Sequence, residues 1–580
     1  MSASHVRFPR VAVIPRNAAP MMSSMLTRRR SLRTGAVKQP RSSLTRRRSL
    51  RTGAVKQPRS SSRGVSSRVP LDASEKVIST TPGIDVLPEV PLPLIQVMSR
   101  GVENFPTMMM EWSSKYGDIF TMQLRPGGPK TVIVADPEGW DKILRAEGDT
   151  PVTVGPALAH MKKYYQDRGE EGGGGNLALE EGDQWRRIRS ALQDGMLRPS
   201  RAAGFTSSVV PVAQALSARL EVEPNPTPER LNDLLQRTTL TMIMAIMLGE
   251  CDNGLVDGTA SKEAEQYLDA ARTIGELGSG FMNGPGLWRY VETPAWSQYV
   301  EAQSVAEAIQ TNWVQQVMDE LDSCEDEATV ERLSQSYLAR LLASRANNDD
   351  ILSIKEVVSN VGGFVQGGVD TTSGLLSWLL VNLAMNPEAQ DRLRAELVDK
   401  LGGADATKRA ALGRSYNNMS SGGNDEEEDS SLALPYLEAV LRETYRLTTP
   451  VLGVPRRLPE DITINGIYVE KQTPLLLMTG KALKDDELFD DAKEFKPERW
   501  LGDASSKLCG KARKAISLAP FGRGKRMCIG SNIAQVEARV ILVRLLQDYK
   551  IVTDATEPPS MRQRTVVVPH PMPALKFEKI

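Results

Sequence analysis

The segment from Phe521 to Gly530, FGRGKRMCIG, combines a single cysteine with glycines and basic residues. Its glycines permit a tight turn that brings backbone N–H groups close to a ligand. An amphipathic helical pattern follows and runs through Lys550. We expect the N–H groups of the turn and the start of that helix to stabilise a thiolate and to lower the pKa of Cys528.

Three roles are open to this cysteine. An iron porphyrin needs one negatively charged sulfur that is shielded from water and hydrogen-bonded. A nucleophilic cysteine needs a histidine nearby as a base, and the chain holds only His5, His160 and His570. A buried structural cysteine would not explain the surrounding glycines and arginines. The four cysteines of the chain form no CxxC pair, which argues against a disulfide framework or a structural zinc site and fits a reducing compartment.

A second chemical signature is Gly367-Gly-Val-Asp370-Thr371-Thr372, inside a helical pattern over about 351–385. Each glycine in a helix interior costs about 1 kcal/mol relative to alanine, and glycines stand at 362, 363, 367 and 368. They predict a helix that leaves room for another group. An acid followed by a hydroxyl is suited to delivering protons. Close helix packing would also explain the glycines, but it would not explain Asp370 on a buried helix.

The sequence patterns of the elements that must position these residues predict a helix-rich α+β domain with a minor sheet. Short strand patterns occur at 119–124, 131–135, 462–469 and 565–568, and helical periodicity dominates elsewhere. Two low-complexity segments, 170–175 and 402–431, predict solvated loop insertions between helices. We assign one catalytic domain to 71–580.

The N-terminus differs in composition from the rest of the chain. Residues 1–70 hold 17 Lys and Arg and no acid, whereas the remainder has a formal charge of −17. An 18-residue sequence at 26–43 is repeated at 44–61. A basic, acid-free segment is typical of an organelle transit peptide; a basic tail that binds nucleic acid or anionic lipid is the alternative. No apolar run is long enough for a transmembrane anchor.

Several motifs resemble the cytochrome P450 family, in the family's order and over roughly 85–580. Phe521, Gly524, Arg526, Cys528 and Gly530 match its FxxGxRxCxG haem loop. The family's ExxR motif matches Glu443 and Arg446, whose i, i+3 spacing lets them pair on one helical face, and its PERW motif matches 497–500. The resemblance implies a mainly α fold with a minor β-sheet. The haem would lie between the long helix through Thr371 (the I helix) and the Cys528 loop with the helix that follows it (the L helix).

The resemblance also implies the cofactor and its contacts. The cofactor would be haem b, with Cys528 as the axial ligand of its iron and O2 as co-substrate. The haem-binding residues would be Trp185, Arg189, Arg456, Phe521, Arg526 and Gly530, with Arg457 as the alternative to Arg456. Arginine is well suited to the haem propionates because it binds carboxylates with two parallel hydrogen bonds. Thr371 would hydrogen-bond dioxygen or a water, and Asp370 would relay protons. Arg499 would join Glu443 and Arg446 in a buried structural network.

The implied activity is insertion of one oxygen atom from O2 into a lipophilic, sterol- or lipid-like molecule. The alternatives are a haem-thiolate lyase or isomerase that rearranges a peroxide, and a haem-based sensor or carrier. The sequence is most similar to the family's mitochondrial branch, which implies a mitochondrial location. The alternative is a hydroxylase located in plastids. Peripheral membrane association is compatible with these features.

An electron donor is implied as well, and a small ferredoxin fits organelle targeting better than a flavoprotein reductase. The surface near Cys528 is predicted to be basic and to steer an acidic partner. It would be formed by Arg442, Lys507, Lys511, Arg513, Lys514, Arg523 and Lys525.

Overall fold

The computed structural model describes residues 82–124, 127–153, 158–249, 252–323, 326–346, 351–401 and 434–580. Residues 82–580 form one compact unit. The predicted transit peptide, its repeat and the loop insertion at 402–431 lie outside the described residues. Within the described part, the fold is mainly α-helical with small sheets, which confirms the predicted α+β class.

The helices of the N-terminal half are α2 (Pro93–Arg100), α3 (Phe105–Tyr116), α4 (Pro137–Ala146), α5 (Ala159–Asp167), α6 (Gly182–Gln193), α7 (Pro199–Ala203), α8 (Thr206–Val222), α9 (Pro228–Leu248), α10 (Gly254–Asp257) and α11 (Lys262–Asn283). Those of the C-terminal half are α12 (Pro294–Ser323), α13 (Glu327–Gln335), α14 (Tyr337–Ala346), α15 (Ile354–Met385), α16 (Pro387–Leu401), α19 (Pro435–Leu447), α20 (Thr479–Leu483), α21 (Gly502–Lys507), α22 (Gly510–Leu518) and α23 (Ser531–Asp548). None of these described helices is both long enough and apolar enough to cross a bilayer.

The larger sheet has the strand order β1 (Ile119–Met122), β2 (Thr131–Val134), β6 (Leu475–Met478) and β3 (Gly453–Arg456). β2 runs parallel to β6, and the other neighbours are antiparallel. The two-stranded sheets pair β4 (Ile462–Ile464) with β5 (Ile467–Val469), β7 (Tyr549–Val552) with β10 (Lys576–Lys579), and β8 (Ser560–Gln563) with β9 (Val567–His570). The predicted strand regions at 119–124, 131–135 and 462–469 are thereby confirmed, and the one at 565–568 overlaps the first two residues of β9.

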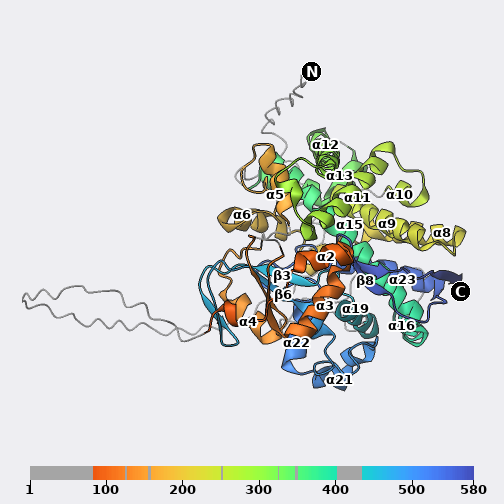
Figure 1. Cartoon of the computed structure of the whole chain (residues 1–580). Helices are drawn as coiled ribbons and strands as arrows, with labels where there is room; N and C mark the ends of the chain where they lie inside the picture. The colour runs from red at the N-terminus through yellow and green to blue at the C-terminus, as the bar shows by residue number, and fades with distance from the viewer. Residues whose placement is uncertain are drawn as a thin grey trace, which may run out of the picture. The chain divides into compact units, whose positions relative to one another are not determined.

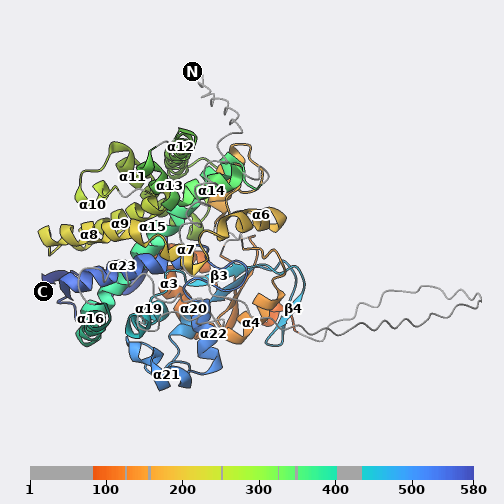
Figure 2. The same cartoon turned by 180° about the vertical axis from the view of Figure 1, so that it is seen from behind.

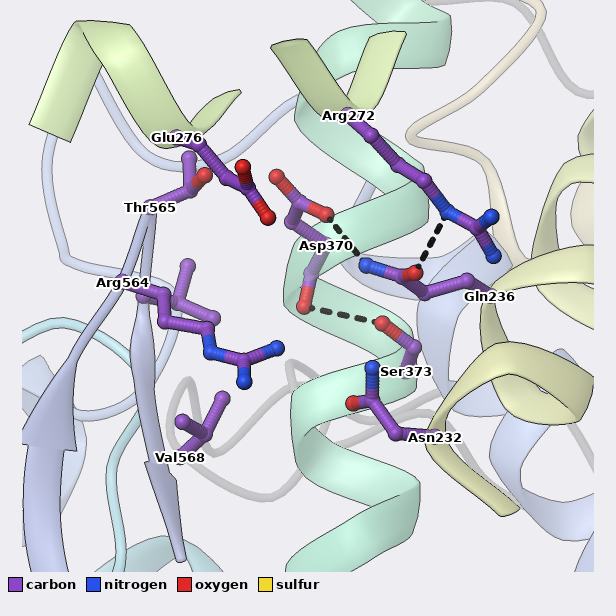
Figure 3. A pocket seen from close by; sticks show the side chains of 10 residues that line it. Asn232, Gln236, Arg272, Glu276, Asp370, Ser373, Arg564, Thr565 and Val568 are labelled. Atoms are coloured by element: carbon purple, nitrogen blue, oxygen red, sulfur yellow. Dashed lines mark hydrogen bonds between the residues drawn. The ribbon is translucent and has the colours of Figure 1, made fainter. Parts of the chain in front are cut away.

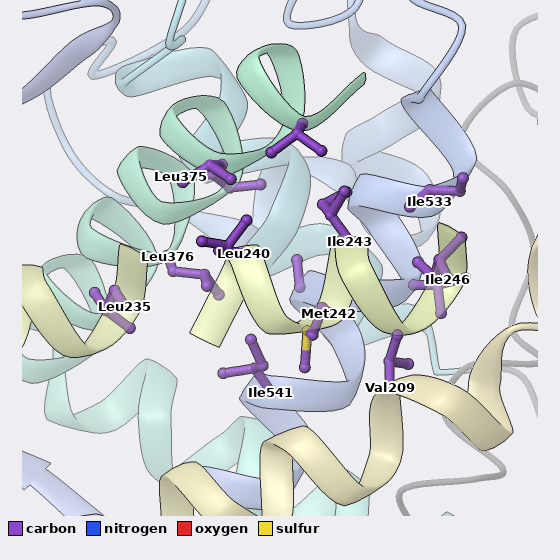
Figure 4. Packing of buried hydrophobic residues seen from close by; sticks show 14 of the residues in the cluster. Val209, Leu235, Leu240, Met242, Ile243, Ile246, Leu375, Leu376, Ile533 and Ile541 are labelled. Atoms are coloured by element: carbon purple, nitrogen blue, oxygen red, sulfur yellow. The ribbon is translucent and has the colours of Figure 1, made fainter. Parts of the chain in front are cut away.

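The helix that carries the glycine-rich signature, α15, runs between α9 and α23 (Figures 1 and 2). A capping box at its start, formed by Ser353 and Glu356, satisfies backbone N–H groups of its first turn. Apolar side chains of α8, α9, α15 and α23 then pack together in the main core (Figure 4). The long helix is therefore held in place on several sides.

Glu443 of α19 lies at the centre of the predicted structural network. Its carboxylate accepts hydrogen bonds from Arg446 (2.8 and 2.9 Å), Arg499 (2.9 Å) and the indole N–H of Trp500 (2.9 Å). Glu443 and Arg446 are fully buried. The predicted structural network is confirmed, and Trp500 adds a donor that the motif alone did not indicate.

The segment at 170–175 differs from its prediction as a solvated loop, because its glycines 173–175 are buried. Glu180 accepts hydrogen bonds from the N–H groups of Gly173 and Gly175 at 2.8 and 2.9 Å, and Asn360 of α15 donates to the carbonyl of Gly175 at 2.8 Å. A Cβ on Gly174 would lie 2.3 Å from the ring of Tyr165. These glycines are there because the backbone packs tightly, so the interpretation as a solvated insertion is wrong for 173–175, whereas Glu171 and Gly172 are exposed.

Candidate active site

Cys528 lies at the end of the loop between α22 and α23. Its N–H donates to the carbonyl of Phe521 at 2.9 Å, and the ring of Phe521 packs edge-on against Tyr445, with 5.6 Å between ring centroids. Gly522 and Gly524 have φ angles of 72° and 85°, a region that favours glycine. The loop therefore turns back on itself and ends at the cysteine.

The side chain of Cys528 lies deep in the protein, although part of its surface is accessible to solvent. The thiol therefore faces open space inside the protein. Burial raises the pKa of Cys528 more than the Gly530 N–H and the Arg189 guanidinium lower it. The predicted lowering of this pKa is therefore wrong, because these two interactions do not offset desolvation. A bound metal cation would supply what the loop lacks, since it deprotonates a coordinating thiol.

Three arginines from distant parts of the chain gather beside this loop. Burial, together with the positive charges of Arg456 and Arg189, lowers the pKa of Arg526 to about 9. Arg189 of α6 is buried, and its Nε atom has no hydrogen-bond acceptor among the described residues. A buried cluster of cations with an unmatched donor calls for an anion.

Arg526 also joins the haem loop to the chain around it. It donates to the carbonyls of Pro151 at 2.7 Å and Glu180 at 2.8 Å, and more weakly to that of Leu177 at 3.4 Å. Its guanidinium stacks on the ring of Trp185, 4.1 Å from the centroid. The structure thus brings Trp185 and Arg526 together and gives Arg526 three backbone partners that the sequence did not predict.

Arg456 of β3 forms a buried ion pair with Glu147 at 2.7 Å. The other carboxylate oxygen of Glu147 lies 3.3 Å from the N–H of Lys525, in the haem loop. Of the two candidate arginines, Arg456 is the one whose positive charge lowers the pKa of Arg526, which places it beside this loop. Sequence reasoning missed Glu147, and no local pattern marks a pair between residues so far apart in the chain.

Open space also borders α15. Gly367 is exposed although its helix crosses the core, and a Cβ placed on it would meet no atom within 4 Å. The hydroxyl of Thr371 donates to the Gly367 carbonyl at 2.6 Å. The predicted local opening of this helix is therefore present, and Thr371 lies beside it.

These features fit a haem. Cys528 offers one sulfur to the iron, and the Arg189 Nε is an unmatched buried donor for a propionate. Arg456, Arg526 and Trp185 lie around the same place, and α15 provides an opening at Gly367. Two carboxylates on a planar ring would match this arrangement of guanidinium groups.

Asp370 faces a different side of α15 from Thr371, and no hydrogen bond joins their side chains in the described part of the chain. The Gln236 amide donates to Asp370 at 3.4 Å and is held in turn by Arg272 at 2.9 Å (Figure 3). Burial raises the pKa of Asp370 more than Thr565, Gln236 and the nearby Arg564 lower it. The carboxyl is thus shifted toward its neutral, proton-carrying form.

A polar pocket lies beside Asp370, with residues of α9, α11, α15 and the β8–β9 turn around it (Figure 3). Its cavity volume is about 30 Å³, which is room for one or two water molecules. Besides Asp370, charged side chains of Arg272, Glu276 and Arg564 line it. Gln236 and Arg272 are functional candidates that the sequence did not reveal, because they come from helices far from the motif.

Four of the seven cations of the predicted basic surface near Cys528 pair with carboxylates. Lys514 pairs with Glu138 and Asp141 of α4 at 2.6 and 3.0 Å. Arg523 pairs with the same Asp141, Lys525 pairs with Asp149, and Lys511 lies 3.8 Å from Asp136. The prediction of an open positive patch is wrong in this respect, because α4 brings carboxylates to it from far away in the sequence.

The similarity of this chain to known proteins agrees with the geometry. The family model described as Cytochrome P450 matches residues 87–577. The chain is 27% identical to the mitochondrial 1,25-dihydroxyvitamin D(3) 24-hydroxylase of Mus musculus, with 86% of this chain and 88% of that protein covered. It is 26% identical to the mitochondrial 25-hydroxyvitamin D-1 alpha hydroxylase of Rattus norvegicus, with 88% and 96% covered.

A third relative is the probable mitochondrial cytochrome P450 12b2 of Drosophila melanogaster, which is 26% identical over 75% of this chain and 77% of its own length. The names of these relatives confirm the mitochondrial address predicted from the basic N-terminus. The chain therefore belongs to the cytochrome P450 family, and it is a mitochondrial monooxygenase that binds haem b and uses O2 to oxidise a lipophilic molecule.

Proposed function

We propose that this monooxygenase hydroxylates a sterol- or secosteroid-like lipid. The observation that carries the proposal is the similarity over most of the chain to two vitamin D hydroxylases. Apolar side chains at the start of β3 support it: Val451 is 46% exposed, and a Cβ placed on Gly522 of the loop would lie 4.0 Å from Val454. Apolar side chains at this place suit a substrate with a hydrocarbon body.

We assign the haem contacts to the residues that gather around Cys528. Cys528 is the iron ligand, Arg189, Arg456 and Arg526 hold the propionates, and Trp185 orients Arg526 through the stacked ring. Phe521 and Gly530 fix the loop around the sulfur. Haem, when bound, supplies the oxygen-activating chemistry; the residues of the chain bind, orient and exclude water around it.

Proton delivery falls to Asp370 and Thr371. Asp370 takes up protons from water in the polar pocket, and its raised pKa shifts the carboxyl toward its protonated form. Thr371 presents its hydroxyl oxygen beside Gly367 on the other side of the helix turn. Because no hydrogen bond joins the two side chains, the transfer between them runs through a water molecule.

The electron donor we propose is a ferredoxin, and residues 1–70 are the transit peptide that brings the enzyme to the same compartment. A fusion of residues 1–75 to a fluorescent protein should enter mitochondria. A nuclear or diffuse cytosolic signal would favour the basic-tail interpretation instead.

We also propose that the enzyme contacts the membrane surface. Three exposed apolar side chains support this contact: Leu92, Ile95 and Met98 lie at the start of α2 and along it and are 59–68% exposed.

A substrate screen tests the proposed substrate class. Purified haem-loaded enzyme is titrated with sterols, secosteroids, fatty acids, carotenoids and terpenes, and the haem spin state is followed by absorbance. We expect sterols or secosteroids to shift the spin state. With ferredoxin, its reductase and isotope-labelled dioxygen, their product should then carry one labelled oxygen atom. A spin-state shift with fatty acids or terpenes alone would contradict the proposal.

A further inference from the structure

Glu147, the residue at which α4 ends, is a buried acid that has no role among those assigned above. Its Oε2 atom accepts a hydrogen bond from the Nε of Arg456 at 2.7 Å, and the two side chains are only 4% and 1% exposed. Of the three arginines that gather beside the Cys528 loop, Arg456 is the only one with an ion pair in the described part of the chain. Loss of either partner would leave an uncompensated buried charge.

The second carboxylate oxygen of Glu147 faces the haem loop. Oε1 lies 3.3 Å from the N–H of Lys525, and a Cβ placed on Gly524 would lie 2.6 Å from it. Gly524 also has a φ angle of 85°, so glycine is required there both for the backbone conformation and for the close approach. One carboxylate therefore joins β3 to the loop that ends at the cysteine.

The residues after Glu147 keep it in this place. The ammonium group of Lys525 donates to the carbonyl of Gly148 at 2.9 Å, and the N–H of Arg457 donates to the carbonyl of Val152 at 3.0 Å. The segment 147–152 is thus bound to the haem loop on one side and to the end of β3 on the other. Glu147 is held by backbone contacts and can itself hold a long side chain.

The contact with Glu147 uses only one edge of the Arg456 guanidinium. Nη1 donates to the carbonyl of Pro455 at 2.9 Å, and Nη2 reaches the carbonyl of Arg523 only at 3.5 Å. A guanidinium has five N–H groups, so two of those of Arg456 have no acceptor among the described residues. A haem carboxylate is an acceptor that matches such a pair of donors.

We propose that Glu147 is a positioning residue for haem binding: it holds Arg456 by its Nε, leaves the other N–H groups to a haem propionate, and keeps a fixed negative charge beside the haem loop. The inference rests on the proposed assignment of Arg456 to a propionate. A buried negative charge disfavours the addition of an electron nearby, because little water screens it. Glu147 therefore lowers the reduction potential of the iron, which depends on the charges around it.

The first test is a spectroelectrochemical titration of the haem-loaded enzyme without substrate. Glu147→Gln keeps the shape and an acceptor for Arg456 but removes the charge, so the midpoint potential should shift to more positive values. Asp149→Asn is the matched control: it removes one negative charge from the same segment, but that side chain is 83% exposed and screened by water, so the potential should stay almost unchanged. An unchanged potential in Glu147→Gln, or an equal shift in Asp149→Asn, would overturn the proposal.

The second test measures the rate at which haem leaves the oxidised protein, followed by absorbance as the haem transfers to an excess of a haem-free globin. Glu147→Ala removes the support of Arg456 and should release haem several-fold faster than the wild type. Glu147→Gln still accepts the Nε–H of Arg456 and should stay close to the wild type. The double variant Glu147→Ala/Arg456→Ala should release haem no faster than Arg456→Ala, because Glu147 acts through that arginine.

The variants separate this inference from the assignment on which it rests. Normal haem retention in Arg456→Ala would overturn both. Fast haem loss in Arg456→Ala with normal retention in Glu147→Ala, or effects of the two changes that multiply in the double variant, would overturn the role of Glu147 alone. If Glu147→Ala does not fold, the potentials of Glu147→Gln and Asp149→Asn still decide the question.

Discussion

At the scale of single residues, the loop around Cys528 does not by itself lower the pKa of the thiol. One backbone N–H from Gly530 and one guanidinium from Arg189 favour the thiolate, but burial outweighs both. A deeply placed thiol of this kind is a poor nucleophile, because the thiolate is the reactive form. The arrangement therefore favours the role of metal ligand over the role of nucleophile that the sequence left open.

Replacement of this ligand gives the first prediction. In the reduced protein, carbon monoxide should produce the strongly red-shifted Soret band of a thiolate-ligated haem, and Cys528→Ala should lose that band. Cys509→Ala is the matched control, since Cys509 is exposed at the start of α22, and it should keep the band. A Cys528→Ala protein with the shifted band would refute the assignment of the ligand.

The second prediction concerns Thr371. Thr371→Ala should retain haem and substrate binding but divert reductant to hydrogen peroxide, and product formation should fall by up to about a hundredfold because proton delivery fails. Thr371→Ser keeps the hydroxyl and should behave almost like the wild type. The measurement is the ratio of peroxide to product per reductant consumed. Normal coupling in Thr371→Ala would mean that another group delivers the protons.

At the scale of elements, the network around Glu443 joins α19 to the segment that contains Arg499 and Trp500. A buried ion pair that loses one partner leaves an uncompensated charge, which costs about 3–5 kcal/mol. Arg446→Ala and Glu443→Gln should therefore lower the free energy of unfolding by about that amount, as measured by denaturant titration of the haem-loaded protein. Lys576→Ala removes an exposed pair with Asp554 and should change it by less than about 1 kcal/mol. A small effect at Glu443 would show that the network is not required for stability.

Local patterns predicted the elements well and predicted long-range partners poorly. The glycine-containing helix, the strand regions and the helix after Cys528 follow from periodicity and motif spacing, which are properties of neighbouring residues. The pair of Arg456 with Glu147 and the support of Asp370 by Gln236 join residues far apart in the chain. No single-sequence pattern contains that information.

The glycines at 173–175 show a second limit of sequence reasoning. A run of glycines has the composition of a flexible loop, but it also suits a backbone that must approach other groups closely. Here the second reason holds, because Asn360 of α15 and Glu180 bind the turn. The turn thereby connects α15 with the start of α6, the helix that carries Trp185 and Arg189.

At the scale of the whole molecule, charge controls the encounter with the electron donor. The domain after residue 70 is acidic overall, while cations cluster near the Cys528 loop. Carboxylates of α4 and of the residues that flank it pair with four of the seven cations, Lys511, Lys514, Arg523 and Lys525. Lys507, at the end of α21, is exposed and has no ion pair in the described part of the chain. Steering of an acidic ferredoxin toward this surface is therefore weaker than the sequence suggests.

The last prediction follows from that neutralisation. Glu138→Gln and Asp149→Asn each remove a carboxylate that pairs with Lys514 or Lys525, so both variants should accelerate reduction by ferredoxin at low salt. The gain should shrink as the ionic strength rises past about 0.1 M, where the Debye length is about 10 Å. Stability should change by less than about 1 kcal/mol, because the ion pairs are exposed.

Charge reversal at Lys507 completes the experiment. Lys507→Glu should slow the second-order rate of reduction measured by stopped flow, with little change in substrate affinity. Lys262→Glu, at the start of α11 and far from α22 in Figures 1 and 2, is the charge-matched control and should leave the rate unchanged. If the rate is independent of salt in the wild type and unchanged in Glu138→Gln, Asp149→Asn and Lys507→Glu, the ferredoxin binds elsewhere. If the rate falls with salt but only Lys507→Glu changes it, the paired lysines take no part and α21 alone guides the partner.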